Sequence, residues 1–289
     1  MEPIRLNKDE FETIKSKYKN IGCGVDGSIY KIDNKTIYKI YHDNRNLINI
    51  RNPIIDEEGV ILNDFKSLRK YNTNYIENIN YTDKDGVILT REDAIYKAIE
   101  KQKNVHMTDL PQNIIYVDNQ IVGCEYKYYN HKLGIYAAAY LPFKQRLIIC
   151  KKILEKVNEL LDNNIYPVTL AQRSDVFPFK SDGSNVLIGF NLEPIIIDLD
   201  GISAMYSDVF SEKYYKRVLS SLSTLILEIL SRVELADTIE DDEMVINELI
   251  ERMVRNNIPY LISKKYFDYF SLDFDDINQI IKTLEKTIK

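Results

Sequence analysis

Apolar and polar residues alternate over short runs in the first part of the chain, a period of two that is typical of β-strands. Over residues 21–42 we predict the order strand, glycine-rich turn, strand, polar turn, strand. A second pair of strands is predicted at 113–117 and 120–126, joined by an Asp-Asn turn at 118–119. The pattern therefore predicts a strand-rich first part, which a short amphipathic segment at 1–20 precedes.

Two stretches of this first part have apolar residues three and four positions apart, which is the spacing of an amphipathic helix. The first stretch is 57–71, and the second begins at Thr90, a residue that can cap a helix. Asp93, three positions later, completes a capping-box-like pair with Thr90. The apolar positions are Val60, Ile61, Phe65 and Leu68 in the first stretch and Ala94, Ile95, Ala98 and Ile99 in the second.

The second part of the chain has mainly helical periodicity. The predicted helices cover 143–161, 212–233, 239–256 and 274–288. A hairpin-like pair of apolar runs, 185–190 and 194–198, interrupts them. A strand-rich part followed by a helix-rich part predicts an α+β fold with two domains, at 1–126 and 127–289.

Composition narrows the class of protein without fixing its function. The chain has 289 residues, of which 45% are hydrophobic and 28% charged, enough for one large or two small domains with a buried core. No apolar run approaches the ~20 residues that span a bilayer, and the first residues lack the apolar segment of a signal peptide. The net charge of -6 comes without a basic block, so nucleic acid is not expected as a partner.

The cysteines are few and scattered. Cys23, Cys124 and Cys150 are odd in number and far apart, and their spacing predicts neither a disulfide framework nor a zinc site. Such cysteine usage favours a reducing compartment, so we expect a cytoplasmic location.

Three glycines, Gly22, Gly24 and Gly27, form a G-x-G-x-x-G pattern in the first predicted turn. In dinucleotide-binding folds such glycines open a helix, but here a second strand follows, and a third strand carries Lys39. Glycine lets backbone amides approach phosphate oxygens, and a lysine nearby supplies a positive charge for them. The pattern predicts a phosphate-binding turn, and the alternative is a glycine-rich hairpin with a surface lysine.

Two oxygen-bearing side chains lie beside apolar runs in the second part of the chain. The run of isoleucines at 195–197 predicts a buried strand that ends at Asp198, and Asn185 directly precedes another apolar run. An unpaired carboxylate at the end of an apolar strand needs compensation, which a bound metal ion provides. Since Mg²⁺ prefers hard oxygen ligands and keeps some of its waters, Asn185 and Asp198 are predicted metal ligands.

In this order along the chain, the glycine turn, the strand lysine, the asparagine and the aspartate resemble the protein-kinase-like superfamily, which includes small-molecule kinases of the aminoglycoside and choline type. The resemblance covers about residues 18–235. It implies a bilobal fold, with a strand-rich N-lobe and a helical C-lobe, that binds ATP and Mg²⁺ between the lobes. It also implies that the three glycines cover the phosphates, that Ile29 stacks on the adenine, and that Lys39 contacts phosphate.

The resemblance assigns the end of the last N-lobe strand to the purine. Cys124 resembles the gatekeeper residue of the family. The hinge, whose backbone meets the adenine edge, is then formed by Glu125, Tyr126 and Lys127. The alternative is a plain buried strand that ends in a loop.

The resemblance also implies an acidic partner for Lys39 on the helix of the N-lobe. Glu92 is the predicted partner, because its helix precedes the two strands that lead into the hinge. Glu100 and Asp64 are alternatives. Each of these acids could instead be a solvated surface charge.

The predicted catalytic and metal-binding loop, 165–201, departs from the family pattern. The family has H-R-D or H-G-D, with an asparagine five residues after the aspartate, whereas this chain has IYPVTL at 165–170. Alignment of the final leucine places Thr169 at the catalytic aspartate, and threonine cannot accept a proton from an attacking hydroxyl at neutral pH. Asp175 and Asp182, in the insertion that follows, could replace this carboxylate or be ordinary loop acids.

About ten residues, 202–211, precede the helix predicted from 212, too few for the activation segment on which regulated protein kinases present peptides. The first hypothesis is an atypical phosphotransferase that acts on a protein or small-molecule hydroxyl, with Lys39, Asn185, Asp198 and the Thr169 position as its catalytic site. The second is a catalytically inactive pseudokinase that serves as a nucleotide-responsive binding module. The third is an unrelated α+β protein in which the glycines only turn a hairpin.

Overall fold

A computed structural model describes residues 2–24, 27–42, 54–55, 61–62, 91–105, 110–129, 133–170, 185–200, 204–233, 235, 243–269 and 271–287. These residues form a mixed α+β protein, which confirms the predicted fold class at that level. The chain divides into two compact units. Unit 1 comprises Met1–Tyr128 and Asp198–Ser211, and unit 2 comprises Tyr129–Ile197 and Glu212–Lys289. A segment from late in the chain therefore belongs to the N-terminal unit.

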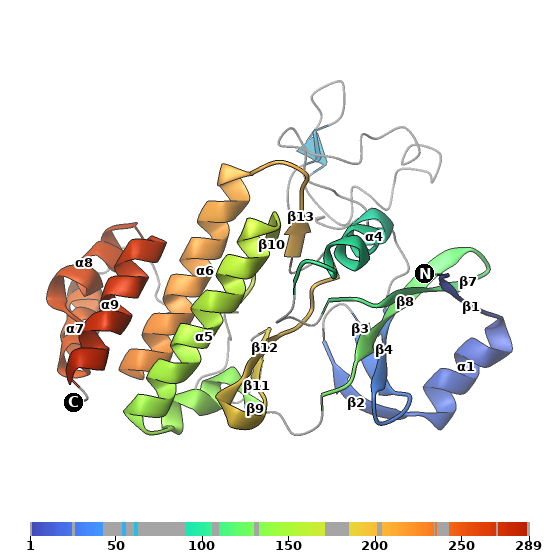
Figure 1. Ribbon diagram of the computed structural model, residues 1–289, viewed down its shortest axis with the longest axis horizontal. Helices are drawn as coiled ribbons and strands as arrows, with labels where there is room; N and C mark the ends of the chain where they lie inside the picture. The colour runs from blue at the N-terminus through green and yellow to red at the C-terminus, as the bar shows by residue number, and fades with distance from the viewer. Residues whose placement is uncertain are drawn as a thin grey trace. The chain divides into compact units, whose positions relative to one another are not determined.

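A six-stranded sheet forms the core of unit 1 (Figure 1). The strands follow the order β1-β7-β8-β4-β3-β2, and neighbours are antiparallel except for the parallel pair β1 and β7. The strands are β1 (Ile4–Leu6), β2 (Lys19–Cys23), β3 (Gly27–Lys31), β4 (Thr36–Tyr41), β7 (Asn113–Val117) and β8 (Gln120–Lys127), and the same unit contains β13 (Ala204–Tyr206) and helices α1 (Lys8–Lys17) and α4 (Arg91–Lys101). The predicted order strand, glycine turn, strand, polar turn, strand is confirmed as β2, β3 and β4, and the predicted second pair is confirmed as β7 and β8.

Alternation along β4 directs its side chains into two different cores. Ile37 and Tyr41 belong to a core that includes Ile95 of α4, whereas Ile40 belongs to a second core that includes residues of α1. Lys39 lies between Ile37 and Tyr41 with the same parity, so its side chain emerges on the α4 face of the sheet. Lys39 is thus the one charged residue among the β4 side chains, Ile37 and Tyr41, on this face of the sheet.

Strand β1 and helix α1 account for the amphipathic segment at the start of the chain. The side-chain oxygen of Asn7 accepts a hydrogen bond from the Glu10 backbone nitrogen at 2.9 Å, and the Asn7 backbone nitrogen donates to the Glu10 carboxylate at 2.8 Å. The sequence pattern Asn-x-x-Glu is typical of such a capping box. The three-residue strand β1 has too short a pattern to be predicted.

The prediction of a helix over 57–71 is wrong at two of its residues. Strand β6 (Ile61–Leu62) pairs antiparallel with strand β5 (Ile54–Ile55). Three of these four residues are β-branched isoleucines, which favour an extended backbone. The other residues of that predicted helix lie outside the described part of the chain, as do Asp64, Thr90, Asp175 and Asp182.

Unit 2 is mainly helical (Figure 1). Helix α5 packs against α6 and α9, and α7 packs against α8. The helices are α5 (Phe143–Asp162), α6 (Glu212–Ser231), α7 (Glu243–Arg255), α8 (Tyr260–Tyr269) and α9 (Phe274–Thr287). The four predicted helices of this part are confirmed as α5, α6, α7 and α9, whereas the aromatic stretch that forms α8 is an addition to the prediction.

A small sheet completes the described part of unit 2. Strand β11 (Val186–Ile188) pairs antiparallel with β12 (Pro194–Ile196), which confirms the predicted hairpin. Strand β9 (Leu133–Gly134) pairs with the other edge of β11. The remaining elements are β10 (Ile165–Pro167) and two short 3-10 helices, η1 (Ile135–Tyr140) and η2 (Phe190–Leu192).

Gly123 of β8 approaches the backbone of β4 so closely that no side chain fits between them. A Cβ at this position would lie 3.1 Å from the carbonyl carbon of Lys39 and closer still to its oxygen. We expect Gly123→Ala to destabilise unit 1 by about 1–3 kcal/mol, the usual cost of overpacking. Gly24→Ala is the matched control, because the nearest atom of the described residues to a Cβ there is 4.0 Å away. Urea unfolding followed by circular dichroism measures both, and equal midpoints would contradict the prediction.

Candidate functional site

Lys39 occupies the middle of β4, in register with Ile29 of β3 and Cys124 of β8. It is 4% exposed. Its ammonium group forms ion pairs with the carboxylates of Asp198 and Asp200, and the Asp200 Oδ2 atom lies 2.8 Å from the lysine Nζ. A buried ammonium group needs such partners, because its desolvation is otherwise unfavourable. The structure therefore brings together Lys39 and Asp198, two predicted site residues that are far apart in the sequence.

Asp198 begins the segment with which the chain returns to unit 1. Its φ angle of 65° lies in the left-handed region, which few residues other than glycine adopt and which aspartate tolerates better than most. The Tyr206 hydroxyl of β13 donates a hydrogen bond to the Leu199 carbonyl at 2.6 Å and so holds the following residue in place. Backbone strain that neighbouring groups maintain in this way is frequent at functional sites.

Asp200 is fully buried and is the site residue that the sequence reasoning misses. The Cys124 thiol donates to its Oδ2 atom at 3.9 Å, and the Tyr41 hydroxyl lies 3.0 Å from the same sulfur. Burial and the charge of Asp200 raise the pKa of Cys124 and of Tyr41, so both groups stay protonated at neutral pH. The Arg91 guanidinium, 3.8 Å from the centre of the Tyr41 ring, links α4 to this network.

Packing requires only one of the three glycines in the turn between β2 and β3. A Cβ at Gly27 would lie 2.5 Å from the carbonyl oxygen of Ile40. Among the described residues, the nearest atoms to a Cβ at Gly22 and Gly24 would be 3.8 Å and 4.0 Å away, and neither glycine has a left-handed backbone. Packing against the described residues and backbone strain therefore do not explain glycine at these two positions. Their lack of side chains does allow a ligand to approach the backbone.

Hydrogen bonds close the glycine turn upon itself. The Gly24 amide donates to the Gly27 carbonyl at 2.9 Å. His42, which directly follows β4, places its Nε2 atom 3.1 Å from the Gly24 carbonyl oxygen and 3.5 Å from the Cys23 sulfur. The imidazole thus connects the strand of Lys39 to the turn, a contact that the sequence pattern does not indicate.

The residues predicted to meet the purine lie at the end of β8. Cys124 and Tyr126 are buried, and Lys127 is exposed. Glu125 is half-buried, and burial raises its pKa, while a hydrogen bond from the Asn113 side chain at 3.3 Å opposes the shift. Contacts of these residues with adenine stay predictions.

The acid predicted as the partner of Lys39 accepts a hydrogen bond from a tyrosine of the same unit. Glu92, in the first turn of α4, accepts a hydrogen bond from the Tyr116 hydroxyl of β7. Glu100, the alternative, forms an ion pair with Lys97 at 3.1 Å on α4. Within the described part of the chain, Lys39 forms ion pairs with the two aspartates described above.

Asn185 and Thr169 meet in unit 2. The Asn185 amide nitrogen donates to the Thr169 carbonyl oxygen at 3.0 Å and to its Oγ1 atom at 2.9 Å. The Asn185 carbonyl in turn accepts a hydrogen bond from the Ile197 amide at 2.8 Å. These contacts fix the residue predicted as the second metal ligand against the residue predicted to replace the catalytic aspartate.

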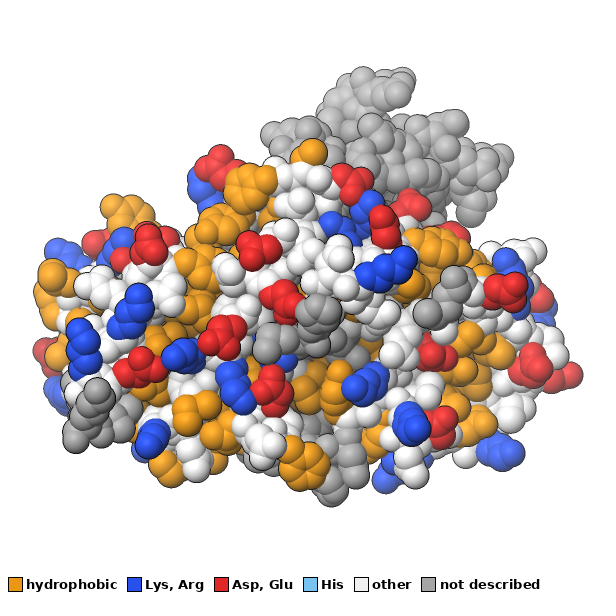
Figure 2. All heavy atoms as spheres, viewed as in Figure 1, with side chains coloured by type: hydrophobic (Ala, Val, Ile, Leu, Met, Phe, Trp, Pro, Cys, Tyr) orange, Lys and Arg blue, Asp and Glu red, His pale blue; other side chains and the backbone are white. Residues whose placement is uncertain are grey.

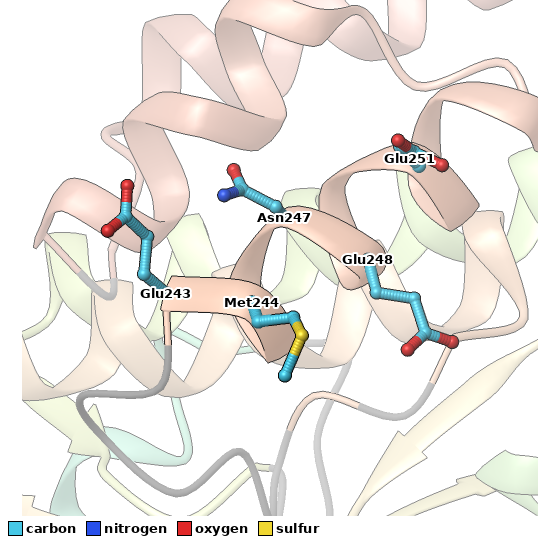
Figure 3. A pocket seen from close by; sticks show the side chains of 5 residues that line it. All are labelled: Glu243, Met244, Asn247, Glu248 and Glu251. Atoms are coloured by element: carbon cyan, nitrogen blue, oxygen red, sulfur yellow. The ribbon is translucent and has the colours of Figure 1, made fainter.

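A separate hollow of about 550 Å³ lies along α7 in unit 2 (Figure 3). It is lined by Glu243, Met244, Asn247, Glu248 and Glu251. All five side chains come from one helix, and none of them is a predicted site residue. Ligand sites usually combine polar groups from several elements around an apolar surface, so this hollow is not assigned a ligand.

Three observations on the described residues concern nucleic acid, metal ions and membranes as other classes of partner. Figure 2 shows Lys, Arg, Asp and Glu side chains interspersed on this face, without a broad basic area among the coloured residues. Within the described ranges, no three His, Cys, Asp or Glu residues are grouped so that they could hold a metal ion. Of the helices that the structure describes, none is both long and apolar enough to cross a membrane.

Neither a family model nor a curated protein matches this chain.

Proposed function

We propose that this chain is a protein-kinase-like protein, with a strand-rich N-lobe and a helical C-lobe, that binds ATP together with Mg²⁺. The observation that carries the proposal is the ion pair between Lys39 and Asp198, which are 159 positions apart in the chain. The glycine turn joins β2 to β3, the strand next to the one that carries Lys39. Three predicted parts of a phosphate site thus belong to one compact unit, which supports the proposal.

Each of these residues has a defined task in the proposal. Lys39 sets its positive charge against the α- and β-phosphates, and the backbone at Gly22 and Gly24 directs amides to the phosphate oxygens. Ile29, the cross-strand neighbour of Lys39, packs on the adenine. The hinge residues 125–127 meet the purine edge with their backbone.

The residues present fit Mg²⁺ in their chemistry. Asp198 offers a carboxylate that is partly open to solvent, and the amide of Asn185 is the second predicted ligand. Oxygen ligands of this kind are what Mg²⁺ prefers, and its usual retention of waters agrees with so small a set of protein ligands. Bound Mg²⁺ neutralises negative charge on the phosphates.

Phosphate transfer to a protein or small-molecule hydroxyl is the enzymatic form of this proposal. A second candidate is the pseudokinase, a nucleotide-responsive binding module without turnover. It is favoured by Thr169, which is held by Asn185 at the position predicted for the catalytic base and cannot take up a proton there at neutral pH. Positioning and charge neutralisation supply most of the catalysis of phosphoryl transfer, so the loss of a base lowers activity without abolishing it.

A cytoplasmic location belongs to the same proposal. The three cysteines are free thiols, and two of them are buried. Free thiols agree with a reducing compartment, where ATP and Mg²⁺ are also available to the protein.

Thermal unfolding of the full-length protein tests nucleotide binding. At 100 times its dissociation constant, Mg-ATP is expected to stabilise the protein by about 2.7 kcal/mol, because only the folded state binds it. For a chain of this size the melting temperature should rise by roughly 5–10 °C. Calorimetry with Mg²⁺ alone and with Mg-CTP provides the controls, since a purine site should prefer ATP.

Release of phosphate in the same samples separates the two candidates. Turnover supports the phosphotransferase, and stabilisation without turnover supports the pseudokinase. If millimolar Mg-ATP produces neither a shift nor turnover, both are wrong and the unrelated α+β protein remains.

A further inference from the structure

The two carboxylates that bind Lys39 differ in their exposure. The side chain of Asp198 is 22% exposed, whereas that of Asp200 is wholly buried. A carboxylate that is open to solvent can exchange its partner for an incoming ligand. A buried carboxylate that lost its cation would be left as an unpaired charge, which is strongly unfavourable. Burial thus suits the two aspartates to different tasks.

Asp200 is held by neighbours other than Lys39 as well. The Cys124 thiol, on the strand adjacent to that of Lys39, donates to the same carboxylate oxygen that Lys39 contacts. The preceding backbone is fixed by the hydrogen bond between the Tyr206 hydroxyl and the Leu199 carbonyl. The carboxylate of Asp200 therefore occupies a defined position beside β4.

The helix acid expected to hold Lys39 has its own hydrogen-bond donor. Glu92 accepts from Tyr116, which belongs to β7, two strands away from β4 in the sheet. The carboxylates of Asp198 and Asp200, which contact the lysine, come from a segment late in the chain.

We propose that Asp200 is the positioning residue of Lys39 and that Asp198 is its exchangeable partner. Asp200 holds the ammonium group at the sheet, and Asp198 turns from Lys39 to a metal ion when nucleotide binds. The first half concerns the protein alone, and the second half rests on the proposed function.

Acylation of lysines in the full-length protein tests the first half. The protein is treated briefly with an N-hydroxysuccinimide acetate ester, and mass spectrometry compares modification of Lys39 with that of Lys31 on β3. Asp200→Asn is expected to raise the ratio of Lys39 to Lys31 modification at least about tenfold, because the ammonium loses its fixed partner. Asp198→Asn should raise the ratio by less than about threefold, since the partner that it removes is partly solvated.

The same measurement recognises a merely structural role. Local unfolding of the sheet would raise modification of Lys31 as well as of Lys39, whereas loss of the Asp200 carboxylate alone should leave Lys31 modified at its wild-type rate. An unchanged ratio in Asp200→Asn, or a larger rise in Asp198→Asn, would overturn the proposal. If Asp200→Asn does not fold, Cys124→Ala replaces it, because this variant removes the thiol donor and keeps all three charges. The ratio should then rise about threefold, and no rise would count against the proposal.

Titration with ATP, with and without Mg²⁺, tests the second half. Mg²⁺ should lower the dissociation constant of ATP for the wild-type protein. In Asp198→Asn this effect of Mg²⁺ is expected to be at least about tenfold smaller, because a metal ligand is removed. Asp200→Asn should keep the Mg²⁺ effect. Full retention of that effect in Asp198→Asn would contradict the exchange. If the wild-type protein binds no ATP, the proposed function fails, while the acylation ratios still decide the task of Asp200.

Discussion

Replacing Lys39 by methionine is expected to destabilise unit 1 by about 3–5 kcal/mol, the usual cost of removing one partner from a buried ion pair. Methionine fills most of the space of the lysine stem, so the loss reports the missing charge rather than a cavity. Asp198 can turn to water, but Asp200 is wholly buried and would be left without its cation. Because the chain has two units, amide hydrogen exchange in β4 and β8 is the measurement that isolates the change.

Lys97→Met provides the matched control for this prediction. Lys97 also forms an ion pair with an aspartate of unit 1, at 2.7 Å, but the side chain of that partner, Asp208, is 71% exposed. Exposed pairs contribute little, so the loss should stay below about 1 kcal/mol. Equal losses of unfolding free energy in the two variants would mean that water reaches the ion pairs of Lys39. The description of these pairs as a buried network would then be wrong.

The strands that present Lys39 are predictable because their signals are local. The alternation along β3 and β4 needs only a few adjacent residues to be recognised. The hairpin of β7 and β8 turns at Asp118 and Asn119, whose φ angles of 50° and 62° are those that a two-residue hairpin turn requires. Aspartate and asparagine tolerate this left-handed backbone, which is why the turn is legible in the sequence.

Short strands that depend on pairing partners far away in the sequence cannot be predicted from such local patterns. Strand β1 has three residues and exists through its parallel pairing with β7, more than a hundred positions later. Strand β6 has two residues, one of which, Ile61, also fits a helical spacing. In both cases the hydrogen-bond partner decides the conformation, and local periodicity does not contain that information.

Only those residues of the candidate site that belong to a recognisable sequence motif are predictable. The order of the motifs along the chain selects Lys39 and Asp198, and the structure places them in contact. Asp200 follows an apolar run as part of Asp-Leu-Asp, so a second carboxylate is visible in the sequence. Its contact with Lys39 is not, because that contact depends on how this segment packs against a strand far away in the sequence. Burial beside the lysine is a property of the folded unit alone.

The largest change in activity is expected from Thr169→Asp, a substitution that rests on the proposed function. A carboxylate in the place of the catalytic base can accept a proton from the attacking hydroxyl or water, which contributes about 10²–10⁴-fold. Asn185 can orient the new side chain, since its amide nitrogen lies 2.9 Å from the Thr169 Oγ1 atom. Release of phosphate from Mg-ATP by the full-length protein should therefore rise at least about hundredfold.

Thr169→Asn separates the proton acceptor from the shape of the side chain. Asparagine has the size of aspartate and can accept the same hydrogen bond from Asn185, but it cannot take up a proton at neutral pH. A gain in the aspartate variant alone would assign it to base catalysis and would support the alignment of residues 165–170 with the family's catalytic loop. If both variants release phosphate at the wild-type rate while Mg-ATP still stabilises them, Thr169 does not occupy the place of the base. The wild-type protein would then bind nucleotide with its reacting centre built from other residues, or without one.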